Sequence, residues 1–321
     1  MVKTLEIIIL EDYIHLILLI MIPKDDKLVL VAIYLYISKL HDVNLKYSYQ
    51  RFTNNNTPAF TDVEIITIYL YVITEMQLFK VKQIHKYAKK HLLSWFPKLP
   101  SYSAFNNRLN NLSELFKVLS YQLITEFQSV DCDYEKSLLD SMPIITCSGK
   151  RKGKVAPEIT DKGFNSTKNM YFFGLKLHAL AFRRPKKLPF PEQLLITSAS
   201  VNDLTLFKQA DWDLIKNRTF FGDKAYFDPD YFKNMLKKNN SIMMTPVKAV
   251  KGQPENVKQR NKAANDLFST AVSKVRQPIE GLFNWLIEKT DIQRASKVRS
   301  TKGLMVHVFG KIAAAYIFLI F

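Results

Sequence analysis

The chain has 321 residues, of which 46 are Lys or Arg and 29 are Asp or Glu, so its formal net charge is +17. Hydrophobic residues make up 47% of it, which is the composition of a folded protein rather than of a disordered tail. This length excludes a peptide-scale module and fits one large domain with a smaller one, or two of middling size. A folded, strongly basic protein most often binds a polyanion, although a lysine-rich proteome produces the same bias.

The cysteines and the apolar start exclude further classes. Cys132 and Cys147 form no CxxC pair and have no histidine at zinc-site spacing, so neither a disulfide framework nor a zinc knuckle is indicated. Acidic residues interrupt the apolar stretch 5–21, and no basic region precedes it, so it is a poor signal peptide or membrane span. We therefore expect a cytoplasmic protein. Met21 precedes a better-capped amphipathic segment and is an alternative natural start to Met1.

Helical periods run from residue 25 to about 127. Thr61 and Glu64 form a capping box, and the apolar run 65–79 after it is typical of a helix buried in a bundle. A helix is also expected over 81–95, and the prolines that follow this segment end it. A serine then caps one more helix, whose apolar residues follow the i, i+4, i+7 pattern: Phe105, Leu109, Leu112, Phe116 and Leu119.

The other surface of this last helix carries amide and basic side chains. They are Asn106, Asn107, Arg108, Asn110 and Asn111. Two helices joined by a short proline-containing turn, the second bearing Asn and Arg, suit a helix-turn-helix that reads the major groove of DNA. An ordinary helical hairpin with a solvated polar face is the alternative, and the residues alone do not exclude it.

Strand patterns replace helical ones from Ser137 to Val247. The expected strands are 138–146, 171–182, 193–200, 219–222 and 242–247, and the expected helices between the later strands are 203–210 and 229–238. Strands followed by alternating helices and strands predict an α/β fold with a mixed sheet. Basic loops are expected at 148–169 and 248–262. Helices resume after 263, and Lys311 makes the apolar stretch 306–321 a better core helix than membrane span.

Three acidic residues form the candidate chemical site. Asp140 lies in an apolar run, Asp223 follows a predicted strand, and Glu280 follows Arg276 by four residues. Open α/β sheets bind ligands at the carboxyl ends of their strands. Three carboxylates that converge from distant positions can hold two hard divalent cations, as phosphodiester cleavage requires. Pro278 either starts the helix that carries the glutamate or kinks it.

Other polar residues around these acids have two interpretations each. Lys176 and His178 alternate on one strand face, where they either line the site and contact phosphate or form a partly buried polar pair. Lys224 either contacts phosphate or neutralises Asp223. Asp203 fits a helix N-cap better than a metal ligand.

The order Asp, Gly-Asp-Lys-x-Tyr and Arg-x-x-x-Glu resembles that of the DDE transposases of bacterial insertion sequences. Segments 89–105 and 297–311 are similar to the insertion-sequence 982 group, and the likeness runs from about residue 25 to the end. The resemblance implies a ribonuclease H-like catalytic core in residues 131–321, a mixed sheet flanked by helices. It also implies an all-helical DNA-binding domain in residues 1–130.

The resemblance assigns a catalytic and metal-binding triad to Asp140, Asp223 and Glu280, which would hold two Mg²⁺ or Mn²⁺ ions. It makes Arg276 an accessory residue near the site. Related groups also have a tyrosine before the arginine and a lysine after the glutamate, and the lysine contacts DNA. Those positions are occupied here by Ser273 and Ile287, and Lys289, two residues from the expected register, is the candidate for that accessory DNA contact.

The implied activity is transposition. Such an enzyme binds the terminal inverted repeats of its element, cleaves DNA with divalent metal ions and joins the cut end to target DNA. The implied partner is double-stranded DNA in the bacterial nucleoid, bound by a homodimer or larger assembly, without a membrane. Water and then the freed 3′-hydroxyl attack, so no tyrosine nucleophile is needed. The alternatives are a ribonuclease H-like nuclease without strand transfer and a non-catalytic DNA-binding protein from a decayed element.

Overall fold

The computed structural model describes residues 26–48, 58–165, 168–212, 215–248 and 252–320. The chain divides into two compact units. The helical unit contains the described residues up to Phe127, together with 289–292 and 297–320. The sheet unit contains 128–288 and 293–296. The segment around Met21 lies outside the described residues, so the choice of start stays a prediction.

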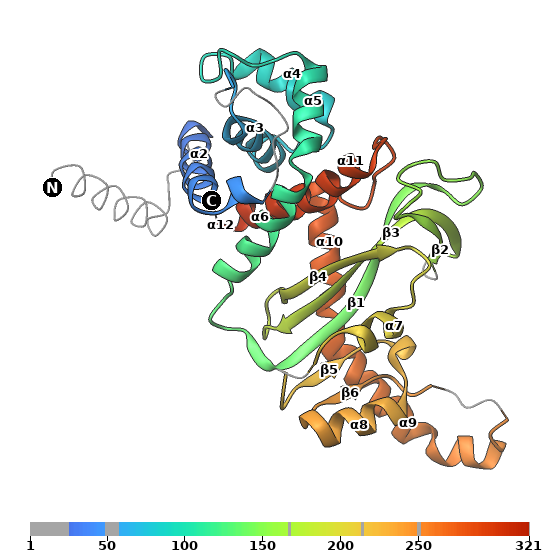
Figure 1. Cartoon of the computed structure of the whole chain (residues 1–321). Helices are drawn as coiled ribbons and strands as arrows, with labels where there is room; N and C mark the ends of the chain where they lie inside the picture. Colours follow the sequence, from blue (N-terminus) through green and yellow to red (C-terminus); the bar gives the residue numbers. More distant parts are fainter. Residues whose placement is uncertain (1–25, 49–57, 166–167, 213–214, 249–251, 321) are drawn as a thin grey trace. The chain divides into compact units, whose positions relative to one another are not determined.

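The helical unit is built from helices near both ends of the described chain (Figure 1). They are α2 (Asp26–Val43), η1 (Leu45–Tyr47), α3 (Asp62–Thr74), α4 (Val81–His91), α5 (Tyr102–Asn111), α6 (Ser113–Glu126), α11 (Thr301–Met305), η3 (Val306–Gly310) and α12 (Lys311–Ile320). The predicted capping box is confirmed, because the hydroxyl of Thr61 accepts a hydrogen bond from the backbone N–H of Glu64 at 3.2 Å. Every residue of α3 except Glu64 is buried, as its apolar sequence predicts.

The single helix predicted after Ser101 is two helices. α5 ends at Asn111, Leu112 has φ −87° and ψ 14°, and α6 begins at Ser113. The apolar residues on both sides of the break remain buried, so the helical period continues across it. The two consecutive asparagines before the break have low helix propensity and favour its position. Periodicity alone could not have revealed this break.

α12 packs against α3 and α6 and completes the core of the helical unit. Among the described residues, one stretch, Thr301–Ile320, is long and apolar enough to cross a membrane, with a mean hydropathy of 1.8. Since 67% of its apolar window is buried inside the structure, its composition is accounted for by a core helix. Lys311 within it is only 2% exposed, and its Nζ donates to the carbonyl of Asp291 at 3.0 Å.

A short π-helix, η3, lies in the middle of this C-terminal helical stretch. His307 and Lys311 are one turn apart there, and each binds a carbonyl of the turn after residue 290. The His307 Nε2 lies 2.8 Å from the Ile292 carbonyl, beside Asp291, which adopts a positive φ of 51°. Burial lowers the pKa of His307 to about 3 and that of Lys311 to about 7.

The sheet unit contains one mixed sheet. Its strands are β1 (Asp133–Ser148), β2 (Asp161–Asn165), β3 (Met170–Arg183), β4 (Phe190–Ser198), β5 (Thr219–Phe221) and β6 (Ile242–Met244). The order is β2-β3-β1-β5-β6, and β4 also pairs with β3. β3 is antiparallel to β1, β2 and β4. β5 lies between β1 and β6 and is parallel to both. The predicted α/β fold with a mixed sheet is confirmed.

The outer edge of β3 is shared by two strands, and the change of partner occurs at a glycine. β2 pairs with 170–174 and β4 with 175–182. Gly174 faces a bulge in β1, and a Cβ there would lie 1.9 Å from the carbonyl oxygen of Ile144. Only glycine permits so close an approach between two backbones.

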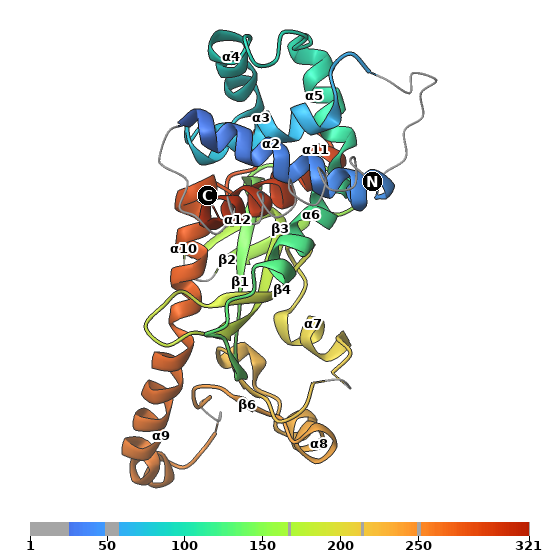
Figure 2. The same cartoon turned by 90° about the vertical axis from the view of Figure 1, so that its left-hand side faces the viewer.

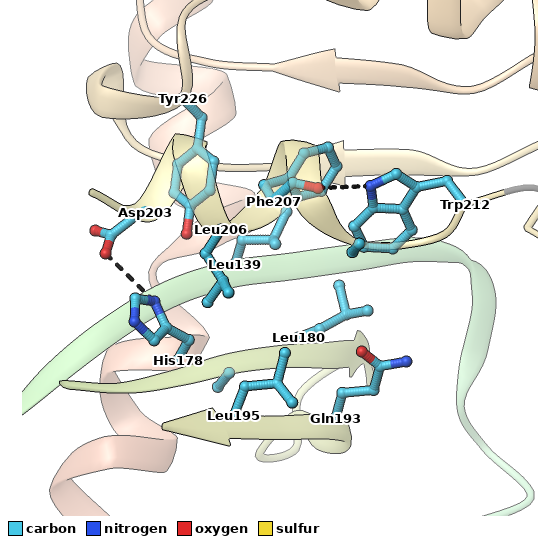
Figure 3. A pocket seen from close by; sticks show the side chains of 12 residues that line it. Leu139, His178, Leu180, Gln193, Leu195, Asp203, Leu206, Phe207, Trp212 and Tyr226 are labelled. Carbon is cyan, nitrogen blue, oxygen red and sulfur yellow. Dashed lines mark hydrogen bonds and ion pairs between the residues drawn. The ribbon is translucent and has the colours of Figure 1, made fainter. Parts of the chain in front are cut away.

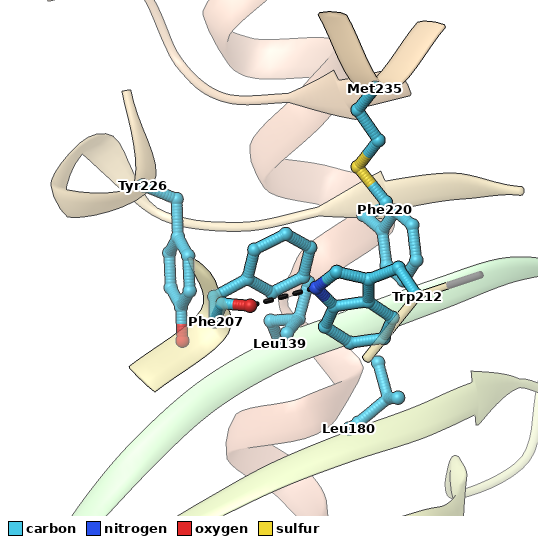
Figure 4. Close-up of a cluster of buried hydrophobic side chains, with 7 residues drawn as sticks. All are labelled: Leu139, Leu180, Phe207, Trp212, Phe220, Tyr226 and Met235. Atoms are coloured by element: carbon cyan, nitrogen blue, oxygen red, sulfur yellow. Dashed lines mark hydrogen bonds between the residues drawn. The ribbon is translucent and has the colours of Figure 1, made fainter. Parts of the chain in front are cut away.

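Helices cover both faces of the sheet. They are α7 (Asp203–Gln209), η2 (Lys224–Tyr226), α8 (Pro229–Asn239), α9 (Glu255–Arg276) and α10 (Pro278–Thr290). Figure 2 shows α9 and α10 on one side of the sheet and α7 and α8 on the other. On the α7 side, aromatic rings fill the core around Phe207, which stacks on Trp212 at 4.4 Å and meets Phe220 edge-on (Figure 4).

Three local predictions are wrong. β2 lies inside the region expected to be a loop, 148–169, and α9 begins at Glu255 inside the expected loop 248–262. Both segments are rich in charged residues, which is why loops were expected there. In the first, the pairing of β2 with β3 stabilises a strand despite that composition. The N-cap of α7 is Asn202, whose side chain accepts from the N–H groups of the second and third residues after it, and not Asp203.

One late segment of the chain packs with the early helices. Residues 297–320 pack in the helical unit, whereas the prediction placed them with the rest of 131–321. The apolar surfaces of α12 and α3 are complementary, and neither could be buried alone. The roles given to residues 1–130 and 131–321 stay predictions.

Candidate active site

The sheet register places Asp140 and Asp223 at equivalent positions on neighbouring parallel strands. β1 and β5 pair up to Leu138 and Phe221, and each aspartate lies two residues beyond its member of that pair. Residues two apart on a strand share a face. The negative charge of Asp223 raises the pKa of Asp140, as expected for neighbouring carboxylates. These two predicted residues are therefore brought together by strand pairing.

Arg276 joins Asp140 to the third acid. Its Nη1 lies 2.6 Å from Oδ2 of Asp140, and its Nη2 lies 2.6 Å from Oε1 of Glu280. Pro278 starts α10, and Gln277 before it keeps helical φ and ψ, so residues 276 and 280 still face each other as an i, i+4 pair. The alternative of a kinked entry is not needed.

Burial dominates the electrostatics of Asp140. Desolvation raises the pKa of its carboxyl group to about 6, and the attraction of Arg276 and a hydrogen bond from the N–H of Ser141 only partly offset this. Burial lowers the pKa of the Arg276 guanidinium, but Asp140 and Glu280 outweigh that effect and raise it overall. Glu280 is half exposed, with 51% of its side chain accessible, so it can turn outward.

A fourth carboxylate, Asp203, lies on the other face of β1, and Figure 3 shows it beside His178. Its Oδ2 accepts from the Ser141 hydroxyl at 3.1 Å, and its Oδ1 lies 3.2 Å from Nζ of Lys176. The strand register explains this cluster, because Ser141 and Pro143 pair with His178 and Lys176 across β1 and β3. All of its side chains are at most 19% exposed where their ion pairs are formed.

His178 is held between two strands and the helix α7. Its Nδ1 lies 3.3 Å from Oδ1 of Asp203, and its Nε2 lies 2.8 Å from the Thr197 hydroxyl. Burial lowers the pKa of His178 to about 4, against the attraction of Asp203, so the ring is neutral near pH 7. Since a carboxylate only accepts, the tautomer protonated at Nδ1 fits both contacts. Lys176 and His178 thus lie on the face of Ser141 rather than on that of Asp140.

Tyr226 is a buried phenol that lies within electrostatic range of three aspartates. It is 3% exposed, and burial together with the charges of Asp203, Asp140 and Asp223 raises its pKa well above the usual range. The adjoining cavity under α7 measures about 40 Å³ and is lined mainly by apolar side chains (Figure 3). It has room for a water or two, not for a nucleotide base. Its role is one of packing.

Of the remaining predicted residues, Lys224 directly follows Asp223 in the chain, whereas Lys289 and the residues of α5 belong to the helical unit. Lys224 is exposed, and Nζ of Lys289 lies over the ring of Phe318 in the helical unit, 4.6 Å from its centroid. Arg108 binds the carboxylate of Asp62 and a backbone carbonyl, so it fixes α5 to the start of α3. On α5, Asn107 is exposed, and Asn106 and Asn110 are partly exposed.

The residues that the structure describes include no group of three His, Cys, Asp or Glu side chains arranged to hold a metal ion. The donor chemistry nevertheless fits a hard divalent cation, because Asp140, Asp223 and Glu280 offer carboxylate oxygens. In this arrangement, Arg276 supplies the positive charge between two of them. A bound cation would have to replace that guanidinium on at least one carboxylate.

A family model described as a transposase DDE domain matches residues 131–318, which is more than half of the chain. The chain therefore belongs to the DDE transposase family. This membership supports transposase activity and DNA binding, and transposases of this family generally use divalent metal ions. No curated protein and no solved structure matches the chain.

Asp203 and Ser141 are the polar residues beside the site that sequence reasoning missed. Asp203 was assigned to capping because an aspartate at the start of a helix usually caps it. The alternation of Lys176 and His178 on one strand is visible in the sequence, but their link to Ser141 depends on the pairing of β1 with β3. That link becomes readable only once the register of β1 and β3 is known.

Proposed function

We propose that this transposase binds the terminal inverted repeats of its element, cleaves DNA at their ends and transfers the cut strand to target DNA. The observation that carries the proposal is the parallel register that sets Asp140 beside Asp223, with Arg276 joining Asp140 to Glu280. Carboxylates gathered next to a guanidinium, in a chain of net charge +17, suit chemistry on a polyanion.

The sheet supports a ribonuclease H-like assignment. Leaving out β2, its strand order is β4-β3-β1-β5-β6, with three antiparallel strands followed by two parallel ones. One acid lies on the central strand β1 and another just beyond its parallel neighbour β5, within the mixed sheet flanked by helices that the resemblance implies. The motifs at 89–105 and 297–311 support membership of the insertion-sequence 982 group.

Each residue of the site has a role in this proposal. Asp140 and Asp223 form the rigid part, since the first lies within β1 and the second accepts from the N–H of Ala225 at 2.8 Å. Glu280, half exposed, is the adjustable third ligand. Arg276 keeps the acids close together in the absence of DNA and can turn to a phosphate when they are otherwise neutralised.

Two Mg²⁺ or Mn²⁺ ions, when bound, would supply activation of the attacking hydroxyl and stabilisation of the leaving oxygen. The chain provides the carboxylates that hold and orient them. No side chain acts as a nucleophile, and the burial of Tyr226 agrees with that. We also propose a dimer or larger assembly on DNA, and a location in the bacterial nucleoid.

The test uses the purified full-length chain and a duplex that carries the inverted repeats flanking its gene. The expected result is Mg²⁺-dependent nicking at the repeat end, followed by joining to a second duplex. Asp223→Asn should lower nicking by roughly a thousandfold or more, because a metal ligand is lost while an oxygen remains to accept from Ala225. Asp230→Asn, at an exposed position of α8, is the matched control.

Two outcomes select the alternatives. Nicking without joining supports a nuclease that performs no strand transfer. Repeat binding without nicking in the unaltered chain supports a non-catalytic DNA-binding protein. Nicking that survives Asp223→Asn contradicts the proposed site.

A further inference from the structure

A polar groove in the helical unit joins the candidate recognition helix to a segment almost two hundred positions later. It measures about 490 Å³ and is lined by Asn107, Asn110, Asn111, Ser300, Thr301 and Lys302. The two sides are in contact, since Nζ of Lys302 donates to the side-chain oxygen of Asn111 at 3.1 Å, across 191 positions. The groove therefore belongs to the folded unit and not to one mobile segment.

The close approach of the two sides depends on small and capped residues. The hydroxyl of Ser300 accepts from the N–H of Gly303 at 3.1 Å and caps α11. A Cβ at Gly303 would lie 3.1 Å from the Ser300 hydroxyl oxygen and 3.4 Å from the side-chain oxygen of Asn110, so the start of α11 and α5 are in van der Waals reach. The backbone at the start of α11 thus lies directly beside the amide side chains of α5.

The recognition helix is held rigidly in the unit. His85 of α4 binds the carbonyl of Pro100 at 2.9 Å and packs edge-on against Phe105, which fixes the turn between α4 and α5. Arg108 is used on the inner side of α5, where it binds Asp62. The amides at 107, 110 and 111 consequently face the groove on a fixed support.

Both sides of the groove come from segments without acidic residues. From Met76 to Ser113 there is no Asp or Glu, and the basic residues there are Lys80, Lys82, Lys86, Lys89, Lys90, Lys98 and Arg108. No acidic residue follows Asp291, and Lys297, Arg299 and Lys302 are exposed. A groove of amides and lysine between two segments without acidic residues favours a polyanion.

We propose that this groove binds double-stranded DNA, with Lys302 on the phosphate backbone and Asn107 and Asn110 on base edges. Asparagine pairs with adenine through two hydrogen bonds, and lysine binds phosphate as a point charge. The segment 297–302 is then part of the DNA-binding surface, which a helix-turn-helix alone does not include. The inference rests on the proposed function and names the surface that reads the repeat.

The test measures binding of the full-length chain, in EDTA, to a repeat duplex and to a scrambled duplex of the same composition. Lys302→Ala should weaken binding to both duplexes similarly and reduce the slope of log K against log salt by about one. Lys117→Ala, an exposed lysine of α6 away from the groove, is the matched control and should change neither. The double variant Asn107→Ala with Asn110→Ala should lower the preference for the repeat by roughly 30-fold or more, because two base contacts are lost.

Unchanged affinity, slope and preference in the folded groove variants overturn the proposal. If Lys302→Ala does not fold, protection from hydrogen exchange in the unaltered chain decides. DNA should then protect 105–112 and 298–303 together, and protection of neither overturns the groove. Because binding is measured without metal, loss of nicking with the groove intact counts against the proposed catalysis alone.

Discussion

The guanidinium of Arg276 lies 2.6 Å from the carboxylate of Asp140, whose pKa burial raises to about 6 even with this arginine beside it. The arginine thus stabilises the ionised form of an acid that its surroundings disfavour. The same side chain reaches Glu280 on the next helix. Arg276 therefore joins Asp140 on the sheet to Glu280 on α10.

Arg276→Ala should lower the free energy of unfolding by roughly 1–3 kcal/mol, because a partly buried carboxylate loses a charged hydrogen-bond partner. Arg260→Ala, at an exposed position earlier on α9, is the control and should cost less than about 0.5 kcal/mol. Urea unfolding of both variants measures the difference. Equal stability of the two variants would show that the pair contributes nothing.

Asp203→Asn should destabilise the sheet unit by roughly 1–3 kcal/mol, since Lys176 stays largely buried but loses its carboxylate. The pKa of His178 should fall further, because the negative charge of Asp203 raises it. Unfolding of the variant measures the first effect, and an NMR titration of the imidazole measures the second. Asp266→Asn, exposed on α9, should leave both unchanged; an unaltered imidazole pKa in Asp203→Asn would contradict the contact.

The lowered pKa of Lys311 predicts that the free energy of unfolding rises with pH above neutral. Its pKa is lowered from 10.5 to about 7 by burial, so between these values the unfolded chain holds a proton that the folded chain has released. Unfolding then takes up a proton, and the free energy of unfolding should rise by up to about 1.4 kcal/mol per pH unit. This rise of the free energy of unfolding with pH is expected above pH 7 and not below it.

Lys311→Met is the variant that checks this sign. It keeps the length of the side chain and removes the titrating group, so its stability should change much less between pH 7 and 9 than that of the unaltered chain. Lys117→Met, at an exposed position of α6, should keep the full rise. Thermal unfolding at several pH values measures all three. A variant whose slope matches the original would falsify the assignment to Lys311.

Gly174→Ala should be among the most damaging small substitutions in the sheet. A Cβ would lie 1.9 Å from the carbonyl oxygen of Ile144, and backbone must move to admit it, at a cost of about 3 kcal/mol or more. Gly281→Ala in α10 is the contrast, because its Cβ would lie 3.4 Å from a flexible Leu188 side chain and alanine favours helix by up to about 1 kcal/mol. Opposite signs of the two stability changes are expected.

Local sequence patterns predicted most of the helices and strands, but not which of them pair or pack with one another. The strand around 138–146 is recoverable because an apolar run there ends in Ile144, Ile145 and Thr146, and the strand around 171–182 because aromatic residues and alternating apolar and polar residues mark it. Asp140 and Asp223 could be chosen from the same patterns. Their proximity could not, since it depends on the register between β1 and β5, and register is a property of two strands together.

The remaining differences arise from tertiary packing. The break between α5 and α6 leaves the apolar period intact, so the period does not reveal it. β2 is stabilised by its backbone pairing with the edge of β3, which no local pattern indicates. The position of residues 297–320 is set by the apolar surface of α3, which no local signal identifies as their partner. Arg276 could be named from spacing to Glu280, but its contact with Asp140 required the placement of α9 on the sheet.

Because Tyr69 in α3 donates to the carbonyl of Val306, 237 residues later, the helical unit joins early and late parts of the chain. During translation the first helices leave the ribosome long before α12 is made, so the apolar helix α3 waits without its partner. The sheet unit can form in that interval, but the core around α3 cannot. A ribosome that stalls before residue 301 would release a chain with that apolar helix uncovered, prone to aggregation and open to proteases.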